Sequence, residues 1–161
     1  MSFTVVVPNV EELTEGDPHD LVRENAARKA RSVPGGRVLG VDTAVVLDGR
    51  PLGKPRDAGE ARTFLTALSG RTHEVLSGVM LREEGGERER VAATSVRFRA
   101  LDQRDLDWYI ASEEWRERAG GYAIQGRGGA LVEKIHGDYW NVVGLPVPAL
   151  LELDPGLLHP G

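Results

Sequence analysis

Cysteine is absent from the 161-residue sequence, which excludes disulfide bonds and thiolate metal sites and leaves the redox compartment open. The sequence also has no apolar run near the roughly 20 residues that a membrane-spanning helix requires. Residues 1–7 contain neither a basic leader nor a cleavage site. We therefore expect a cytoplasmic protein without a membrane partner.

A basic block is missing as well. Lys and Arg total 20 against 25 Asp and Glu, so the formal net charge is −5, and we expect no nucleic-acid partner. The densest charged run, residues 82–90, mixes both signs around two glycines and is typical of a solvated hairpin tip. A length of 161 residues with 40% hydrophobic residues suits one core, so we expect a single domain over residues 1–161.

Apolar patterns and turn residues predict alternating strands and helices. Strands are predicted over residues 3–7, 38–42 with an extended continuation to 47, about 73–81, about 91–99 and 130–135. Helices are predicted after the N-cap residues Asp17, Asp57 and Asp102, with a short helix over 148–153. This order predicts an α/β fold, a mixed twisted sheet with flanking helices. Because ligands of such sheets lie beyond strand ends, Asp42 and Thr43 are predicted to border a site.

Individual residues leave the chemistry open. Asp42 could bind a divalent cation or accept a proton from water, and it could equally cap a turn. Lys54, between Gly53 and Pro55, could direct its ammonium at a phosphate, although an isolated lysine is more often an ordinary surface residue. Lys29 lies near a helix C-terminus, where it also offsets the helix dipole. Gln125, in a glycine-rich run, could bind a base edge or satisfy loop backbone.

The glycine-rich run matches neither a P-loop nor a dinucleotide fingerprint. The four histidines lack the spacing of zinc ligands. Composition and spacing alone therefore predict an α/β domain with an anion site.

Five short sequence runs, which occur in a fixed order along the chain, make this prediction more specific. They are Val-Leu-Gly-Val-Asp-Thr-Ala-Val-Val-Leu-Asp-Gly (38–49), Leu-Gly-Lys-Pro (52–55), Leu-Ser-Gly-Arg-Thr-His-Glu-Val (68–75), Tyr-Ala-Ile-Gln-Gly (122–126) and Asn-Val-Val-Gly-Leu-Pro (141–146). Together they resemble the Maf-like nucleotide pyrophosphatases, from about Phe3 to Leu153. The resemblance implies hydrolysis of a nucleoside triphosphate between its α and β phosphates, with Mg²⁺ or Mn²⁺. It also implies a fold like that of inosine-triphosphate pyrophosphatases, with a cleft between two lobes, and a possible homodimer.

Carried over by position, the resemblance assigns a role to seven residues. Asp42 would be the catalytic carboxylate and a metal ligand, Glu11 would assist the metal or water, Lys29, Lys54 and Arg118 would face the phosphates, Thr43 would lie near the base, and Gln125 would help to select it. The runs around Gln125 and over 141–146 resemble the branch that acts on dTTP and UTP. The branch that acts on 7-methyl-GTP usually has an acid at the position of Gln125.

The chain departs from the family pattern at its start. The family normally opens with an apolar strand and a Ser-x-Ser-Pro-Arg-Arg loop, and this sequence begins at the next strand. We therefore expect part of the phosphate-binding machinery to be missing and the chain as given to be impaired. Trp115, Arg118 and Ala123 stand where the family often or usually has proline, lysine and glycine.

Two other functions compete with a dTTP and UTP pyrophosphatase that controls the nucleotide pool. One is a catalytically weakened nucleotide-binding or cell-division regulatory protein. The other is the inosine-triphosphate pyrophosphatase type, which shares the fold and the reaction but acts on purines.

Overall fold

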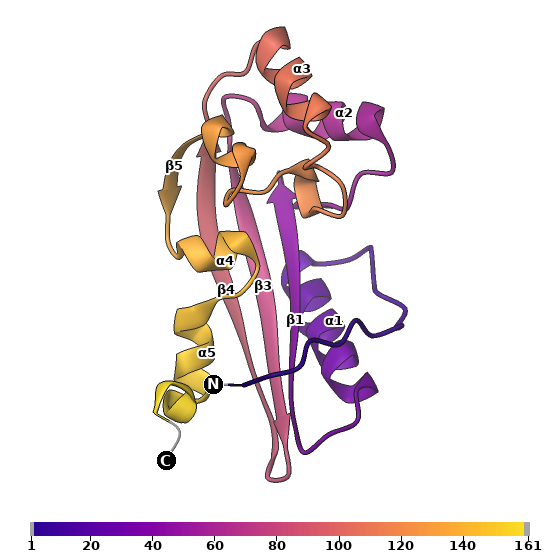
Figure 1. Cartoon of the computed structure of the whole chain (residues 1–161), viewed down its shortest axis with the longest axis vertical. Helices are drawn as coiled ribbons and strands as arrows, with labels where there is room; N and C mark the ends of the chain where they lie inside the picture. The colour runs from indigo at the N-terminus through magenta and orange to yellow at the C-terminus, as the bar shows by residue number, and fades with distance from the viewer. Residues whose placement is uncertain (1, 160–161) are drawn as a thin grey trace.

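Five strands form one sheet in the computed structural model, which describes residues 2–159 (Figure 1). Their order is β2-β1-β3-β4-β5, with β1 Arg37–Leu47, β2 Arg50–Leu52, β3 Thr72–Glu83, β4 Gly86–Phe98 and β5 Val132–His136. The α/β class with flanking helices is confirmed, but the sheet is antiparallel throughout instead of mixed. Tight hairpins join β1 to β2 and β3 to β4, and such turns can connect only antiparallel neighbours.

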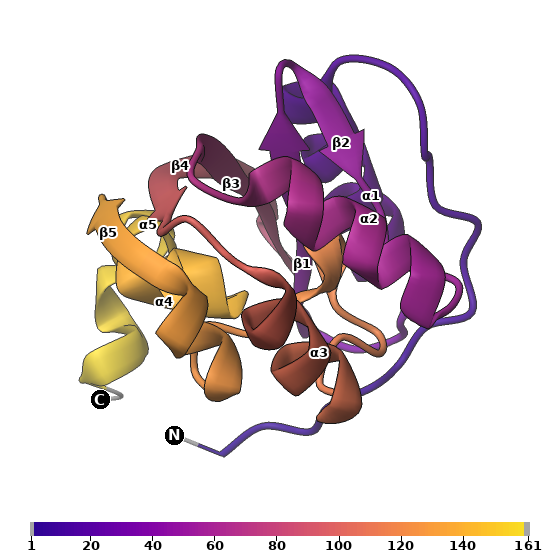
Figure 2. The ribbon, with the colours of Figure 1, turned by 90° about the horizontal axis from the view of Figure 1, so that it is seen from above.

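Helices cover both faces and one end of the sheet. They are α1 Pro18–Ser32, α2 Ala58–Leu68, α3 Gln103–Ala111, α4 Tyr139–Val143 and α5 Val147–Leu153, with 3₁₀ turns η1 Ala119–Gly121, η2 Arg127–Leu131 and η3 Pro155–Leu158. Seen from the α2–α3 end, α1 lies on one side of β1 and β3, and α4 and α5 lie on the other (Figure 2). No helix within residues 2–159 is long and apolar enough to cross a membrane.

The three predicted N-caps are confirmed. Asp17 accepts hydrogen bonds from the backbone N–H groups of His19 and Asp20, ahead of Pro18 in the first turn. Asp57 accepts the N–H of Glu60, and Asp102 forms a reciprocal capping box with Asp105.

The predicted strand over residues 3–7 is wrong. These residues form no strand, and Val7 is 91% exposed. A β-branched run becomes a strand only where a neighbour supplies backbone partners, and no described strand pairs with this segment. Several boundaries also differ. The expected extension to residue 47 belongs to one continuous strand, β4 begins at Gly86 instead of about residue 91, and residues 127–131 are a 3₁₀ turn ahead of β5.

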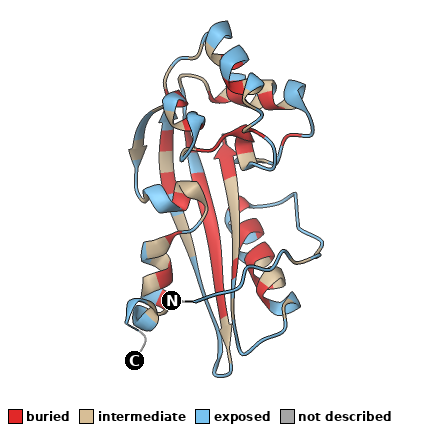
Figure 3. Cartoon of the chain, in the orientation of Figure 1, coloured by how far each residue is buried: buried red, intermediate tan, exposed pale blue. Residues whose placement is uncertain are grey.

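The main core lies at the α2–α3 end of the sheet (Figure 3). Its largest fully buried side chains include Tyr109, Phe98, Leu65, Leu68 and Leu131. Smaller clusters pack α1 on one face of the β1–β3 pair and α5 on the other, around Met80 and Val79 respectively. Met80 and Val79 face opposite ways because side chains alternate along a strand.

Two glycines let α1 lie directly on the sheet. A Cβ added at Gly40 would be 2.2 Å from the carbonyl oxygen of Ala26, and one at Gly78 would be 2.2 Å from that of Val22. Gly78 is the cross-strand partner of Asp42. The helix backbone therefore approaches the sheet most closely on either side of this carboxylate.

We expect Gly78→Ala to lower the free energy of unfolding by about 1–3 kcal/mol, because the helix must move to admit the methyl group. Gly85→Ala is the matched control, since a Cβ at Gly85 has no atom within 4 Å. Urea unfolding measures both variants. Equal stability of the two would show that α1 does not depend on the close approach.

Candidate active site

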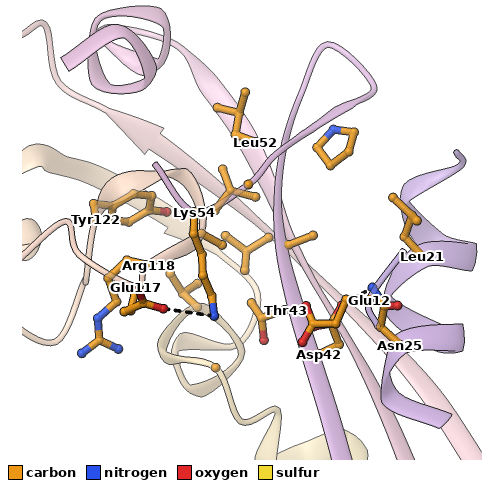
Figure 4. Close-up of a pocket in the computed structure, with 18 of the residues that line it drawn as sticks. Glu12, Leu21, Asn25, Asp42, Thr43, Leu52, Lys54, Glu117, Arg118 and Tyr122 are labelled. Carbon is orange, nitrogen blue, oxygen red and sulfur yellow. Dashed lines mark hydrogen bonds and ion pairs between the residues drawn. The ribbon is translucent and has the colours of Figure 1, made fainter. Parts of the chain in front are cut away.

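A cavity of about 460 Å³ opens between α1, β1 and the segments that follow β2 and α3 (Figure 4). Six of the seven residues assigned from the resemblance line it: Lys29, Asp42, Thr43, Lys54, Arg118 and Gln125. Side chains far apart in the sequence thus meet at one cavity. The expected cleft corresponds to this cavity.

Asp42 lies in the middle of β1, so its predicted position at a strand end is wrong. The strand runs on to Leu47 because residues 43–46 continue to pair with β3. Asp42 still reaches the cavity because β2 pairs only with Val45–Leu47. Beside Asp42, the outer edge of β1 has no partner strand among the described residues.

The Asp42 carboxylate is held by two side chains of α1. Its Oδ1 accepts a hydrogen bond from Lys29 Nζ at 2.8 Å, and its Oδ2 accepts one from Asn25 Nδ2 at 3.2 Å. Lys29 and Asn25 are four residues apart, so one helical face presents both donors. Asn25 also exchanges hydrogen bonds with the backbone of Leu13, at 2.8 and 3.0 Å, and thereby fixes the N-terminal segment over α1.

The N-terminal segment adds a second carboxylate, which comes from Glu12. Both Glu11 and Glu12 are exposed, but only Glu12 lines the cavity, where it binds Lys29 Nζ at 3.0 Å. Glu11, the residue assigned from the resemblance, therefore lies outside the cavity lining, one residue away from it. In an extended segment successive side chains point to opposite sides, so only one of the two can face Lys29.

Lys29 carries a strongly held positive charge. Burial alone would lower its pKa, but the hydrogen bonds and charges of Asp42 and Glu12 outweigh burial and raise the pKa above the usual value. The ammonium also lies 3.4 Å from the carbonyl oxygen of Val41. Lys29 therefore stays charged throughout the neutral pH range.

Cations also gather on the opposite wall. Lys54 follows β2 and lies across from Asp42, 3.6 Å from Glu117, with both side chains exposed (Figure 4). Arg118 lines the same wall and forms no salt bridge within residues 2–159. An exposed pair such as Lys54–Glu117 contributes little stability, so Lys54 and Arg118 are available to an anion.

Three further side chains at the cavity are neutral. The Thr43 hydroxyl is hydrogen-bonded to that of Ser77 at 2.8 Å, and Ser77 is completely buried. The Tyr122 hydroxyl lies 2.6 Å from Nε2 of the buried His73. Gln125 is exposed at the rim, on the glycine-rich loop after Tyr122.

Sequence reasoning missed Glu12, Asn25, Ser77, Tyr122 and His73 as parts of the site. Asn25 had a signal, because it is the one amide within the apolar stripe of α1. Such a residue is buried only when its side chain is hydrogen-bonded. His73 and Ser77 alternate with apolar residues in a buried strand, and nothing in that pattern points to a cavity.

Burial lowers the pKa of His73 from 6.5 to about 4. Between these two values the unfolded chain binds a proton at His73 and the folded chain does not, so the free energy of unfolding falls as the pH drops from about 6.5 to about 4. We expect this residue to contribute up to about 3 kcal/mol to that fall, since one pKa unit corresponds to about 1.4 kcal/mol.

Chemical unfolding over this pH range tests the expectation. His73→Gln should flatten the curve relative to the parent, while the exposed His136→Gln serves as the control and should leave it unchanged. An identical slope in parent and His73→Gln would contradict a buried neutral imidazole.

Comparison with known proteins identifies the family. The family model described as Maf-like protein matches residues 1–153. A dTTP/UTP pyrophosphatase of Anaeromyxobacter dehalogenans is 52% identical over 134 residues, covering 81% of this chain and 69% of that protein. Proteins of the same description from Symbiobacterium thermophilum and Pyrococcus furiosus are 47% and 43% identical, over 94% and 90% of this chain and 81% and 78% of theirs. The chain belongs to the Maf-like protein family.

Proposed function

We propose that this nucleoside triphosphate pyrophosphatase acts on dTTP and UTP, releases the monophosphate and pyrophosphate, and so controls the cytoplasmic nucleotide pool. The observation that carries the proposal is the division of the cavity into two walls. One wall holds the Asp42 carboxylate bound to Lys29, with Glu12 beside it, and the other holds two cations, Lys54 and Arg118, beside Glu117. The curated relatives named dTTP/UTP pyrophosphatase support the substrate class.

The reaction requires a water oxygen to attack the α-phosphorus while the bond to the oxygen bridging the β-phosphorus breaks. Negative charge then develops on the leaving pyrophosphate, where Lys54 and Arg118 stabilise it. Asp42 accepts the proton of the attacking water, because its oxygens are fixed by Lys29 and Asn25 at the cavity wall. Positioning and charge thus supply most of the rate increase.

A divalent cation fits the carboxylate wall. Asp42 and Glu12 lie near each other, because each binds the Lys29 ammonium, at 2.8 and 3.0 Å, and a cation held by both carboxylates would replace that ammonium between them. Residues 2–159 contain no cluster of three or more His, Asp or Glu side chains with metal-ligand geometry. Mg²⁺, however, is commonly held by one or two carboxylates together with substrate phosphates. Asp42 and Glu12 would hold Mg²⁺ or Mn²⁺ in this way, and the cation would neutralise phosphate charge.

The base would lie toward Gln125 and Thr43. A neutral amide can donate to and accept from the edge of a pyrimidine, whereas an acid at this position would favour a cationic methylated guanine. The names of the relatives favour this enzyme over the weakened regulatory protein and over a purine-specific enzyme. The homodimer stays a prediction.

We expect Asp42→Asn to lower the rate of pyrophosphate release from dTTP and UTP by about 100-fold or more, because the amide can neither accept the proton nor bind the cation. The assay uses Mg²⁺ or Mn²⁺, with EDTA as the metal-free arm. Asp48→Asn is the control, since Asp48 lies in the exposed β1–β2 turn. Turnover by Asp42→Asn at the level of Asp48→Asn would exclude Asp42 as the catalytic carboxylate.

We also expect dTTP and UTP to be preferred over 7-methyl-GTP and inosine triphosphate. Gln125→Glu should weaken the use of dTTP by about 1–3 kcal/mol in kcat/KM, because the base edge is then poorly paired. Gln103→Glu, at an exposed position on α3, is the matched control. A parent chain that prefers a methylated or deaminated purine would overturn the substrate assignment.

A further inference from the structure

The glycine-rich loop after Tyr122 is held from behind by two side chains. Tyr109 of α3 is fully buried, and its hydroxyl accepts the N–H of Ala123 at 3.0 Å and donates to Glu114 Oε1 at 3.0 Å. Glu114 accepts the N–H groups of Arg127 and Gly128, each at 3.0 Å. Tyr109 and Glu114 therefore fasten both ends of the loop formed by residues 123–128.

Close contacts explain two glycines of the loop, one with this carboxylate and one with the loop backbone. A Cβ at Gly126 would lie 2.4 Å from Glu114 Oε2, and one at Gly128 would lie 2.3 Å from the carbonyl oxygen of Ala123. Neither position can admit a side chain while the loop wraps around Glu114. The glycine-rich run, which matched no nucleotide-binding fingerprint, is thus built to enclose a side chain of the protein itself.

Because Glu114 occupies backbone N–H groups of the loop, these groups are not free to bind a ligand. Successive backbone N–H groups in a glycine-rich loop are a common phosphate site. Here the N–H groups of Arg127 and Gly128 are already bound to a carboxylate. What the loop offers to the cavity is the side chain of Gln125, which lies between the two fastened ends.

Glu114 is suited to this role by its charge. Burial opposes ionisation, but hydrogen bonds from Gly128, Arg127 and Tyr109 and the charge of Arg118 together hold the pKa of Glu114 below its usual value. Its ionised carboxylate makes charge-assisted hydrogen bonds, which are shorter and stronger than neutral ones.

We propose that Tyr109 and Glu114 are positioning residues that set nucleotide selectivity by fixing the loop carrying Gln125. This inference rests on the proposed function, in which Gln125 binds the base. Neither residue lines the cavity, so both act through the loop rather than on the substrate. The fastened ends hold the backbone on both sides of Gln125, and discrimination between base edges requires that this residue start from one fixed position.

The test compares Glu114→Gln and Tyr109→Phe with the parent, using kcat and KM for dTTP and CTP. Each variant should raise KM for dTTP about tenfold and lower the preference for dTTP over CTP by a similar factor, as expected for losing one charge-assisted bond. The value of kcat should change less than about threefold, because the loop does not contact the reacting phosphates. Glu113→Gln is the matched control, since the neighbouring Glu113 is exposed and pairs with Arg116.

Amide hydrogen exchange on the same proteins supplies a readout that does not depend on turnover. Exchange at Arg127 and Gly128 should accelerate in Glu114→Gln and stay unchanged in Glu113→Gln. Unchanged exchange in Glu114→Gln would overturn the inference, and so would faster exchange with an unaltered dTTP preference. If the parent hydrolyses no triphosphate, the proposed function is wrong, but this result does not decide the role of the loop. Amide exchange, together with calorimetric binding of dTTP and CTP, then decides whether the loop sets nucleotide selectivity.

Discussion

The contact of α1 with the sheet at Gly40 and Gly78 is the constraint on which the candidate site depends. Because neither position has a Cβ, the helix backbone lies against β1 and β3 with no side-chain layer between them. Asn25 and Lys29 consequently reach Asp42 with short hydrogen bonds. A helix held one side-chain layer farther from the sheet would place both donors out of hydrogen-bond reach of Asp42.

The same contact explains how charge is distributed around the cavity. Lys29 lies between two carboxylates on the half-buried wall, so its charge is balanced within the protein. On the other wall, Lys54 pairs only with the exposed Glu117, at 3.6 Å, and the exposed Arg118 forms no salt bridge within residues 2–159. An incoming polyanion therefore exchanges water for protein at the second wall without breaking a buried ion pair, which would be costly.

Local sequence rules predicted most of the fold. Asp17, Asp57 and Asp102 begin helices because a carboxylate satisfies N–H groups of the first turn, which is a local effect. The run over residues 3–7 has the β-branched composition of a strand but forms none, because a strand needs a partner strand from a distant part of the sequence. For the site, the resemblance identified six lining residues. It did not predict that Glu12 binds Lys29, that Thr43 pairs with Ser77, or that Tyr122 pairs with His73.

Each of these contacts joins segments that lie apart in the sequence and meet only when the chain has folded.

The residues of the two cavity walls differ in how far apart they lie in the sequence. The carboxylate wall joins Glu12, Lys29 and Asp42, which span 31 residues of the numbered chain, whereas the cationic wall brings Lys54 together with residues 117–125 from beyond β4. Closing the second loop costs more chain entropy, and during synthesis its residues emerge later. The carboxylate wall can therefore be in place before the cationic wall is complete. A chain interrupted after β3 would carry Asp42, Lys29, Glu12 and Lys54 but would lack Arg118 and the rest of the second wall.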